Sequence, residues 1–172
     1  VAFVRSPHAH ARIDGIAVRA AKAVPGVHAV LTLDDLKPVL AQQRLPRNPH
    51  ATRQPEGSTP FLLAEREVAF VGETVALVAA RNRYVAEDAA ALVVVDYEPL
   101  PAVADCRLAL RPDAPRARLD TPSNLLASFT AAFGDVNAAF AGEATTVTRE
   151  RFQHRGGAHP IAGRGIAVER RA

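Results

Sequence analysis

The stretch from residue 68 to residue 103 constrains the fold of this chain more than any other part. Residues 75–80 are apolar at every position, so protein should cover both faces of the strand that they predict. Asn82 is suited to cap a helix, because its short side chain can accept hydrogen bonds from first-turn amides. The β-branched residues 93–95 predict a second strand, which Pro99 ends because proline cannot donate to a ladder. Strand, helix and strand together predict a right-handed βαβ unit with parallel strands.

Shorter elements are expected on both sides of this unit. In the predicted helix, Val85, Ala89 and Leu92 share one apolar face. Further strands are predicted over residues 1–4, 11–18, 27–32 and 68–71, and short helical turns over 18–23, 33–36 and, capped by Asp105, 108–110. Five prolines interrupt residues 37–65, which predicts a long irregular excursion that is either mobile or a contact surface.

The last third of the chain is less regular. Prolines and alternating charges in residues 111–124 predict a linker laid over a surface. Residues 145–152 alternate in a way that suits a half-exposed strand, and residues 163–169 are the last strand-like run. We therefore expect a second structural unit to begin near residue 145.

Several groups of residues, in a consistent order, resemble the a/b hammerhead domain that opens the large subunit of molybdenum hydroxylases. These enzymes are xanthine dehydrogenases, aldehyde oxidases and aerobic carbon monoxide dehydrogenases. The resemblance lies in residues 4–13, 25–32, 71–76, 83–90 and 95–101. It implies an α+β (mixed α/β) fold, with the hammerhead domain over residues 1–110 and a linker with a short helix over 111–144. Residues 145–172 would then be the truncated start of the molybdopterin-binding domain.

The resemblance also implies an activity for the complete subunit. The holoenzyme would hydroxylate aldehydes or purine-like heterocycles, or oxidise carbon monoxide, with water as the oxygen source. Molybdopterin would be bound by the full-length subunit, and iron–sulfur clusters and FAD by partner subunits or domains. The family's catalytic glutamate lies far downstream, so we expect no catalytic residue here and an inactive isolated chain. In the family's Pro-x-Glu-x-Arg-Gly-like segment, Ala162 stands where the glutamate is usual.

One glycine-containing segment is a candidate for cofactor binding. Consecutive glycines let a backbone approach a ligand closely, and free amides can cradle an anion. Arg155, Gly156 and Gly157 are therefore the candidate cofactor-binding residues, and a plain turn between two strands is the alternative.

Other polar residues offer weaker candidates. His8 and His10 would share a face of a strand and could begin a metal site, but edge histidines explain them as well, and we predict no metal site. Glu73 and Asp96 end core strands and are expected to be solvated or paired.

Composition limits the remaining possibilities. The net charge of +3, without clustered basic residues, argues against a nucleic-acid module. Cys106 is the only cysteine, so a reducing compartment, the cytoplasm, is expected. No stretch predicts a membrane span or a signal peptide.

The chain has no methionine, which suggests a fragment, a split gene or an orphan. A truncated, non-catalytic interaction protein is thus the alternative function, and a homodimer is an open alternative.

Overall fold

The computed structural model describes residues 1–46, 57–141, 145 and 147–151. The chain forms two units, residues 1–130 and residues 131–172. Each unit is described by itself below. The part of the chain that the structure describes holds no helix long and apolar enough to cross a bilayer.

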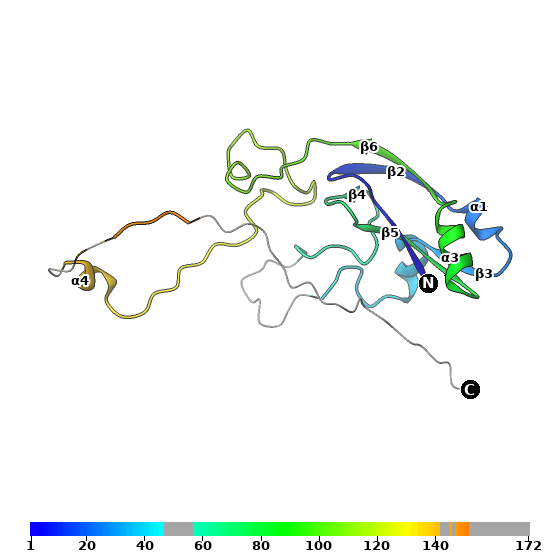
Figure 1. Cartoon of the computed structure of the whole chain (residues 1–172), viewed down its shortest axis with the longest axis horizontal. Helices are drawn as coiled ribbons and strands as arrows, with labels where there is room; N and C mark the ends of the chain where they lie inside the picture. The colour runs from blue at the N-terminus through cyan, green and yellow to red at the C-terminus, as the bar shows by residue number, and fades with distance from the viewer. Residues whose placement is uncertain (47–56, 142–144, 146, 152–172) are drawn as a thin grey trace, which may run out of the picture. The chain divides into compact units, whose positions relative to one another are not determined.

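The described residues of the first unit form two three-stranded sheets, whose strands all pair antiparallel (Figure 1). In the first sheet the order is β1 (Ala2–Arg5), β5 (Thr74–Ala80) and β3 (Val27–Leu31). In the second the order is β4 (Glu67–Val68), β2 (Ala11–Ala17) and β6 (Val94–Pro99). The strands predicted from the first third of the sequence are confirmed, whereas the one expected over 68–71 is reduced to β4.

The helices are short. They are α1 (Arg19–Lys22), α2 (Leu33–Leu36), the 3₁₀ helix η1 (Lys37–Val39), α3 (Arg83–Ala90) and, in the second unit, α4 (Val136–Ala141). The predicted cap of α3 is confirmed, because Asn82 Oδ1 accepts a hydrogen bond from the Val85 amide at 2.9 Å. At the start of α2, the Thr32 amide donates to the Asp35 carboxylate at 2.8 Å. Side-chain acceptors thus fix where both helices begin.

The predicted βαβ unit is wrong in its strand pairing. β5 and β6 do flank α3 along the chain, but they belong to different sheets. The neighbours of β5 on both sides are antiparallel strands, β1 and β3, so no side of it is left for β6. β6 instead pairs with β2, with Tyr97 opposite Ile13.

Two apolar clusters lie on the two sides of β5. One joins Ala76 and Val78 to Ala89 of α3, and the other joins Val75 to Val68 of β4. Protein therefore packs on both faces of this strand, as its continuous apolar sequence predicts.

The buried face of α3 differs from the predicted one. It consists of Ala86 and Ala89, whereas Leu92 is exposed. The reason is that the helix ends at Ala90, so Leu92 lies in the following turn and leaves the helical periodicity.

Three other predictions concern irregular segments. Residues 106–110 form turns and not the predicted helix, while the Asp105 carboxylate does accept from the Arg107 amide at 2.9 Å. The strand predicted over 145–152 is absent from its described residues, which are exposed and pair with no strand there. The strand predicted over 163–169 lies outside the described residues. Between residues 37 and 65, the described part is irregular apart from η1 and one β-bridge between Arg44 and Phe61.

Candidate functional site

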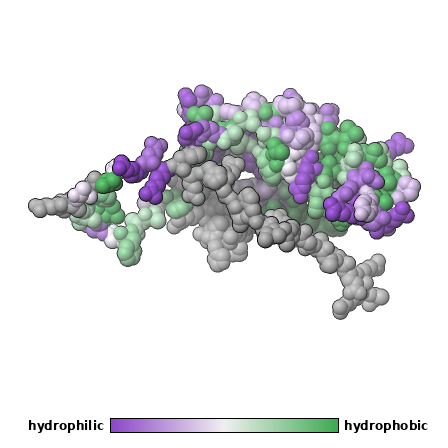
Figure 2. All heavy atoms as spheres, in the orientation of Figure 1, coloured by the Kyte–Doolittle hydropathy of each residue, from purple (hydrophilic) through white to green (hydrophobic). Residues whose placement is uncertain are grey.

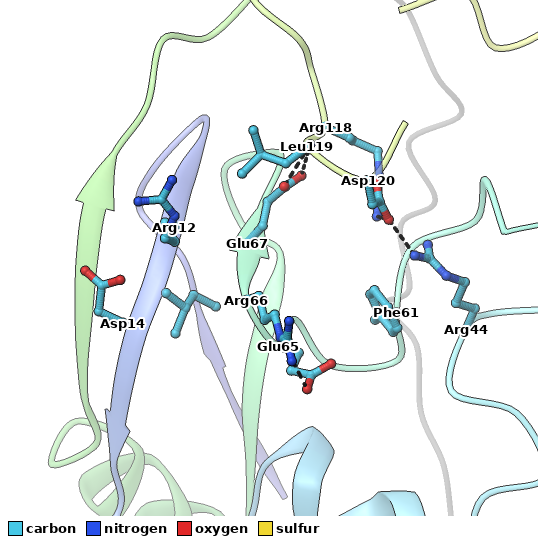
Figure 3. A pocket seen from close by; sticks show the side chains of 11 residues that line it. Arg12, Asp14, Arg44, Phe61, Glu65, Arg66, Glu67, Arg118, Leu119 and Asp120 are labelled. Carbon is cyan, nitrogen blue, oxygen red and sulfur yellow. Dashed lines mark hydrogen bonds and ion pairs between the residues drawn. The ribbon is translucent and has the colours of Figure 1, made fainter. Parts of the chain in front are cut away.

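A cavity of about 690 Å³ lies in the first unit, beside the edge of the second sheet (Figure 3). β2 and β4 form one wall, and two irregular segments, around Phe61 and around Leu119, form the others. Four arginines, four acidic residues and three apolar residues line it: Arg12, Arg44, Arg66, Arg118, Asp14, Glu65, Glu67, Asp120, Ile13, Phe61 and Leu119. The balanced charge gives the cavity no preference for an anion or a cation as a whole.

The segment of residues 116–124, called the strap below, closes one side of this cavity through polar contacts. Both oxygens of Glu67 on β4 accept a hydrogen bond from the Leu119 amide, at 2.8 and 3.1 Å (Figure 3). Within the strap, Asn124 accepts from the Ala117 amide at 2.7 Å, and it donates to the carbonyl of Pro115, just before the strap, at 2.9 Å. A side chain of the edge strand β4 thus binds the backbone of the strap.

Asp120 joins the strap to the irregular excursion before β4. Its carboxylate accepts from Arg118 at 2.9 and 3.0 Å and also pairs with Arg44. The hydrogen bonds from Arg118 lower the pKa of Asp120 from 3.8 to about 2, and Arg44 acts in the same direction. Burial acts in the opposite direction. The Arg44 guanidinium also lies 3.9 Å from the centroid of the Phe61 ring, a cation–π contact. This group of contacts holds two segments together that lack regular structure.

Glu73 is buried, and its carboxylate accepts a hydrogen bond from the Ala69 amide at 2.6 Å. Burial raises the pKa of Glu73, while the Ala69 amide and the nearby Arg118 act in the opposite direction. Glu73 was predicted to be solvated or paired; it is not solvated, and its carboxylate is hydrogen-bonded to the backbone. Asp96, in β6, is exposed.

His10 is buried, with 5% of its surface exposed, so the interpretation as an edge histidine is wrong. Its Nδ1 lies 2.8 Å from the Pro101 carbonyl oxygen, which makes Nδ1 the donor. Its Nε2 is buried without a hydrogen-bond partner among the described residues and lies 4.0 Å from Glu67 Oε1. An imidazole placed this way ties the start of β2 to the chain that leaves β6.

His8 and His10 do not form a shared site. Both precede β2 and neither belongs to a strand; the His8 ring packs edge-on against Tyr97, with centroids 4.9 Å apart. Burial raises the pKa of Tyr97, while Ser6 acts in the opposite direction. No group of three or more His, Cys, Asp or Glu side chains suited to a metal ion occurs within the described ranges.

The predicted cofactor-binding residues, Arg155, Gly156 and Gly157, lie outside the described residues. Sequence reasoning also missed the strap contacts. Their only signal in the sequence is an Arg-Leu-Asp triplet inside a segment rich in proline and charge.

Comparison with known proteins defines the class of protein to which this fold belongs. Residues 1–101 match the family model described as "Aldehyde oxidase and xanthine dehydrogenase, a/b hammerhead domain". The carbon monoxide dehydrogenase large chain of Afipia carboxidovorans is 50% identical over 118 residues, which cover 69% of this chain and 14% of that protein. The nicotine 6-hydroxylase large subunit of Paenarthrobacter nicotinovorans is 39% identical over 167 residues, 97% of this chain and 20% of that protein. A crystal structure of a Cu,Mo-CO dehydrogenase superposes with a TM-score of 0.62 at 46% identity, covering 76% of this chain and 16% of that one.

The chain therefore belongs to the aldehyde oxidase and xanthine dehydrogenase family, and its first unit carries the a/b hammerhead domain. The expected mixed α/β hammerhead fold is confirmed, with two antiparallel sheets and few helices. The family consists of oxidoreductases of the molybdenum hydroxylase type. The chain spans only 14% and 20% of the length of the two curated relatives named above.

Proposed function

We propose that this chain serves as the N-terminal hammerhead portion of a molybdenum hydroxylase large subunit. The observation that carries the proposal is the hammerhead match over residues 1–101, together with a fold that superposes on a CO dehydrogenase. In this proposal the hammerhead domain occupies residues 1–110, a linker with a short helix 111–144, and the start of the molybdopterin-binding domain 145–172. The complete oxidoreductase hydroxylates an aldehyde or a purine-like heterocycle, or oxidises carbon monoxide, with water as the oxygen source.

The described residues have a structural role in this proposal. They supply no cluster that could hold a metal ion, and Cys106 is exposed. They therefore offer no set of side-chain ligands for an iron–sulfur cluster, and no chemical step is assigned to them. Arg155, Gly156 and Gly157 are the residues of this chain that contact the molybdopterin of the full-length subunit in this proposal. The iron–sulfur clusters and FAD belong to partner subunits or domains, and the isolated chain is inactive.

The test is to identify the native polypeptide that contains this sequence. The expected result is a subunit several times larger than the 18.3 kDa of this chain, which co-purifies with molybdenum and reduces a dye with an aldehyde, a purine or carbon monoxide. A native polypeptide of this chain's size, free of molybdenum and inactive, would contradict the proposal and favour the truncated interaction protein. Activity of the isolated chain after loading with molybdenum cofactor would contradict the structural role.

A further inference from the structure

His10 differs from the polar residues on the surface of the first unit. Hydrophilic residues are interspersed with hydrophobic ones over the face of this unit that Figure 2 shows, where water can solvate them. The His10 ring is instead buried, with 4% of its side chain exposed. Its Nε2 has no hydrogen-bond partner within the described part of the chain. A buried polar atom in this position costs free energy unless another group satisfies it.

Two backbone contacts fix the orientation of this ring. Nδ1 donates to the Pro101 carbonyl at 2.8 Å, and the Leu100 amide donates to the His10 carbonyl at 3.0 Å. With its proton on Nδ1, a neutral imidazole presents only a lone pair at Nε2. That lone pair lies 4.0 Å from Glu67 Oε1, which is also an acceptor. Two acceptors therefore face each other, and a hydrogen bond between them requires one further proton.

The contacts of Glu67 indicate where that proton belongs. Both of its oxygens accept from the Leu119 amide (Figure 3), as an ionised, acceptor-only carboxylate does. A protonated imidazole donates from both nitrogens, so His10 can keep Pro101 as its partner and donate to Glu67 as well. The side chain of Glu67 is only 13% exposed, and a cation beside it stabilises its charge.

Other charged groups also face Glu67. They are Arg12, directly opposite on β2, Arg118 of the strap, Glu73 just before β5, and the chain neighbours Glu65 and Arg66. The first two arginines of this set pair with other acidic residues, Glu98 and Asp120. Among the described residues, His10 is the basic side chain that lies within 4.0 Å of a Glu67 oxygen. A charge on His10 therefore acts on Glu67 from the shortest distance.

We propose that a proton on His10 Nε2 holds the strap against β4 through Glu67, and that loss of this proton loosens the strap. At the acidic end of the range in which histidine titrates, roughly pH 5 to 8, the imidazolium fixes the Glu67 carboxylate that accepts from the Leu119 amide. The bound strap thus favours the protonated ring, so strap binding is strongest at low pH and weakens as the pH rises. The strap lies in the linker of the proposed function, but the inference does not depend on that function.

NMR of the 172-residue chain tests the proposal with two readouts. The nitrogen chemical shifts of the His10 ring should change from those of an imidazolium at about pH 5.5 to those of the Nδ1–H tautomer at about pH 8.5. The protection factor of the Leu119 amide, which corrects for the intrinsic effect of pH on exchange, should fall about fivefold or more over the same range. A purely structural role of His10 would leave this protection factor independent of pH.

Conservative substitutions assign the effect to the two side chains. His10→Asn keeps a donor placed like Nδ1 but does not titrate, and Glu67→Gln keeps an acceptor for the Leu119 amide but has no charge. In both variants the protection of Leu119 should be independent of pH. His28→Asn is the matched control, because His28 is an exposed histidine on β3. Glu73→Gln controls for the buried acid, and both controls should keep the pH dependence.

Three outcomes overturn the proposal. The His10 ring could keep one charge state from about pH 5.5 to 8.5. The ring could titrate while the protection of Leu119 stays constant, in which case the proton does not act on the strap. The pH dependence could persist in both His10→Asn and Glu67→Gln, which would assign it to another group. If either variant does not fold, the two readouts of the unchanged chain still decide.

Discussion

Replacing Asp120 with asparagine should loosen the strap and lower the stability of the first unit. Asp120 is the one acidic group that both Arg118 and Arg44 contact in the described structure. The pKa difference between 3.8 and about 2 corresponds to roughly 2.4 kcal/mol at about 1.4 kcal/mol per unit. Its side chain is 34% exposed, and solvent screening reduces this value. We therefore expect Asp120→Asn to cost about 1 kcal/mol at pH 7.

The pH dependence gives a sharper test than the size of the effect. The folded pKa of Asp120 lies below its ordinary value, so its contribution is complete above about pH 4 and is lost as the pH falls through about 2. The difference between the original chain and Asp120→Asn should shrink by about half at pH 3. Urea denaturation at pH 7, 5, 4 and 3 measures it, and hydrogen exchange of the Leu119 amide reports on the strap itself.

Asp113→Asn is the matched control for this experiment. Asp113 lies shortly before the strap, is 79% exposed and has an ion pair with Arg111 at 3.5 Å. A surface pair of this kind contributes under about 0.5 kcal/mol. If Asp120→Asn costs no more than Asp113→Asn, or if its cost does not depend on pH, the carboxylate does not hold the strap.

Four further substitutions test the fold, the helix cap and the buried Glu73. Val78→Asp should unfold the first unit, at a cost of several kcal/mol for an unpaired buried carboxylate, whereas Leu77→Asp should cost less because Leu77 is only partly buried; circular dichroism with thermal melting compares them. Asn82→Ala should cost about 1 kcal/mol through loss of the α3 cap, measured by urea denaturation, and an unchanged midpoint would show that the cap is dispensable. Glu73→Gln should raise the melting temperature at pH 7 but not at pH 4, because burial raises the folded pKa of Glu73 and its ionisation therefore weakens folding as the pH rises past 4.5. A melting temperature that is unchanged at both pH values would refute this reasoning, since glutamine keeps the acceptor for Ala69.

Local features of the fold could be predicted because their signals lie within a few residues. The Asn82 cap needs only the Val85 amide three positions later. The strands of the first third were found from short apolar runs bounded by proline and glycine. The strand predicted over residues 145–152 was wrong because alternation is a property of one segment alone. A strand also requires a partner for its backbone hydrogen bonds, and alternation does not show whether one is present.

Strand pairing could not be predicted from the same local signals. An apolar run such as residues 75–80 suits a parallel strand buried between helices. It equally suits the observed β5, an antiparallel central strand with α3 packed on one side and residues of the second sheet on the other. The two arrangements differ in which strands pair with β5 and in which direction: here β1 and β3 pair with it, both antiparallel.

The candidate site was beyond sequence reasoning because its contacts join positions far apart in irregular segments. Glu67 and Leu119 are 52 positions apart, Arg44 and Asp120 76 positions. Neither the strap nor the excursion before β4 has a hydrophobic period, so no pattern shows which of their polar residues face inward. A strap held by carboxylates and arginines, and not by buried apolar side chains, can separate from the sheet without opening the apolar core. Such local opening requires less free energy than global unfolding. We therefore expect the strap amides to exchange faster than those of β5, and the wall of the cavity that the strap forms to be the most easily opened.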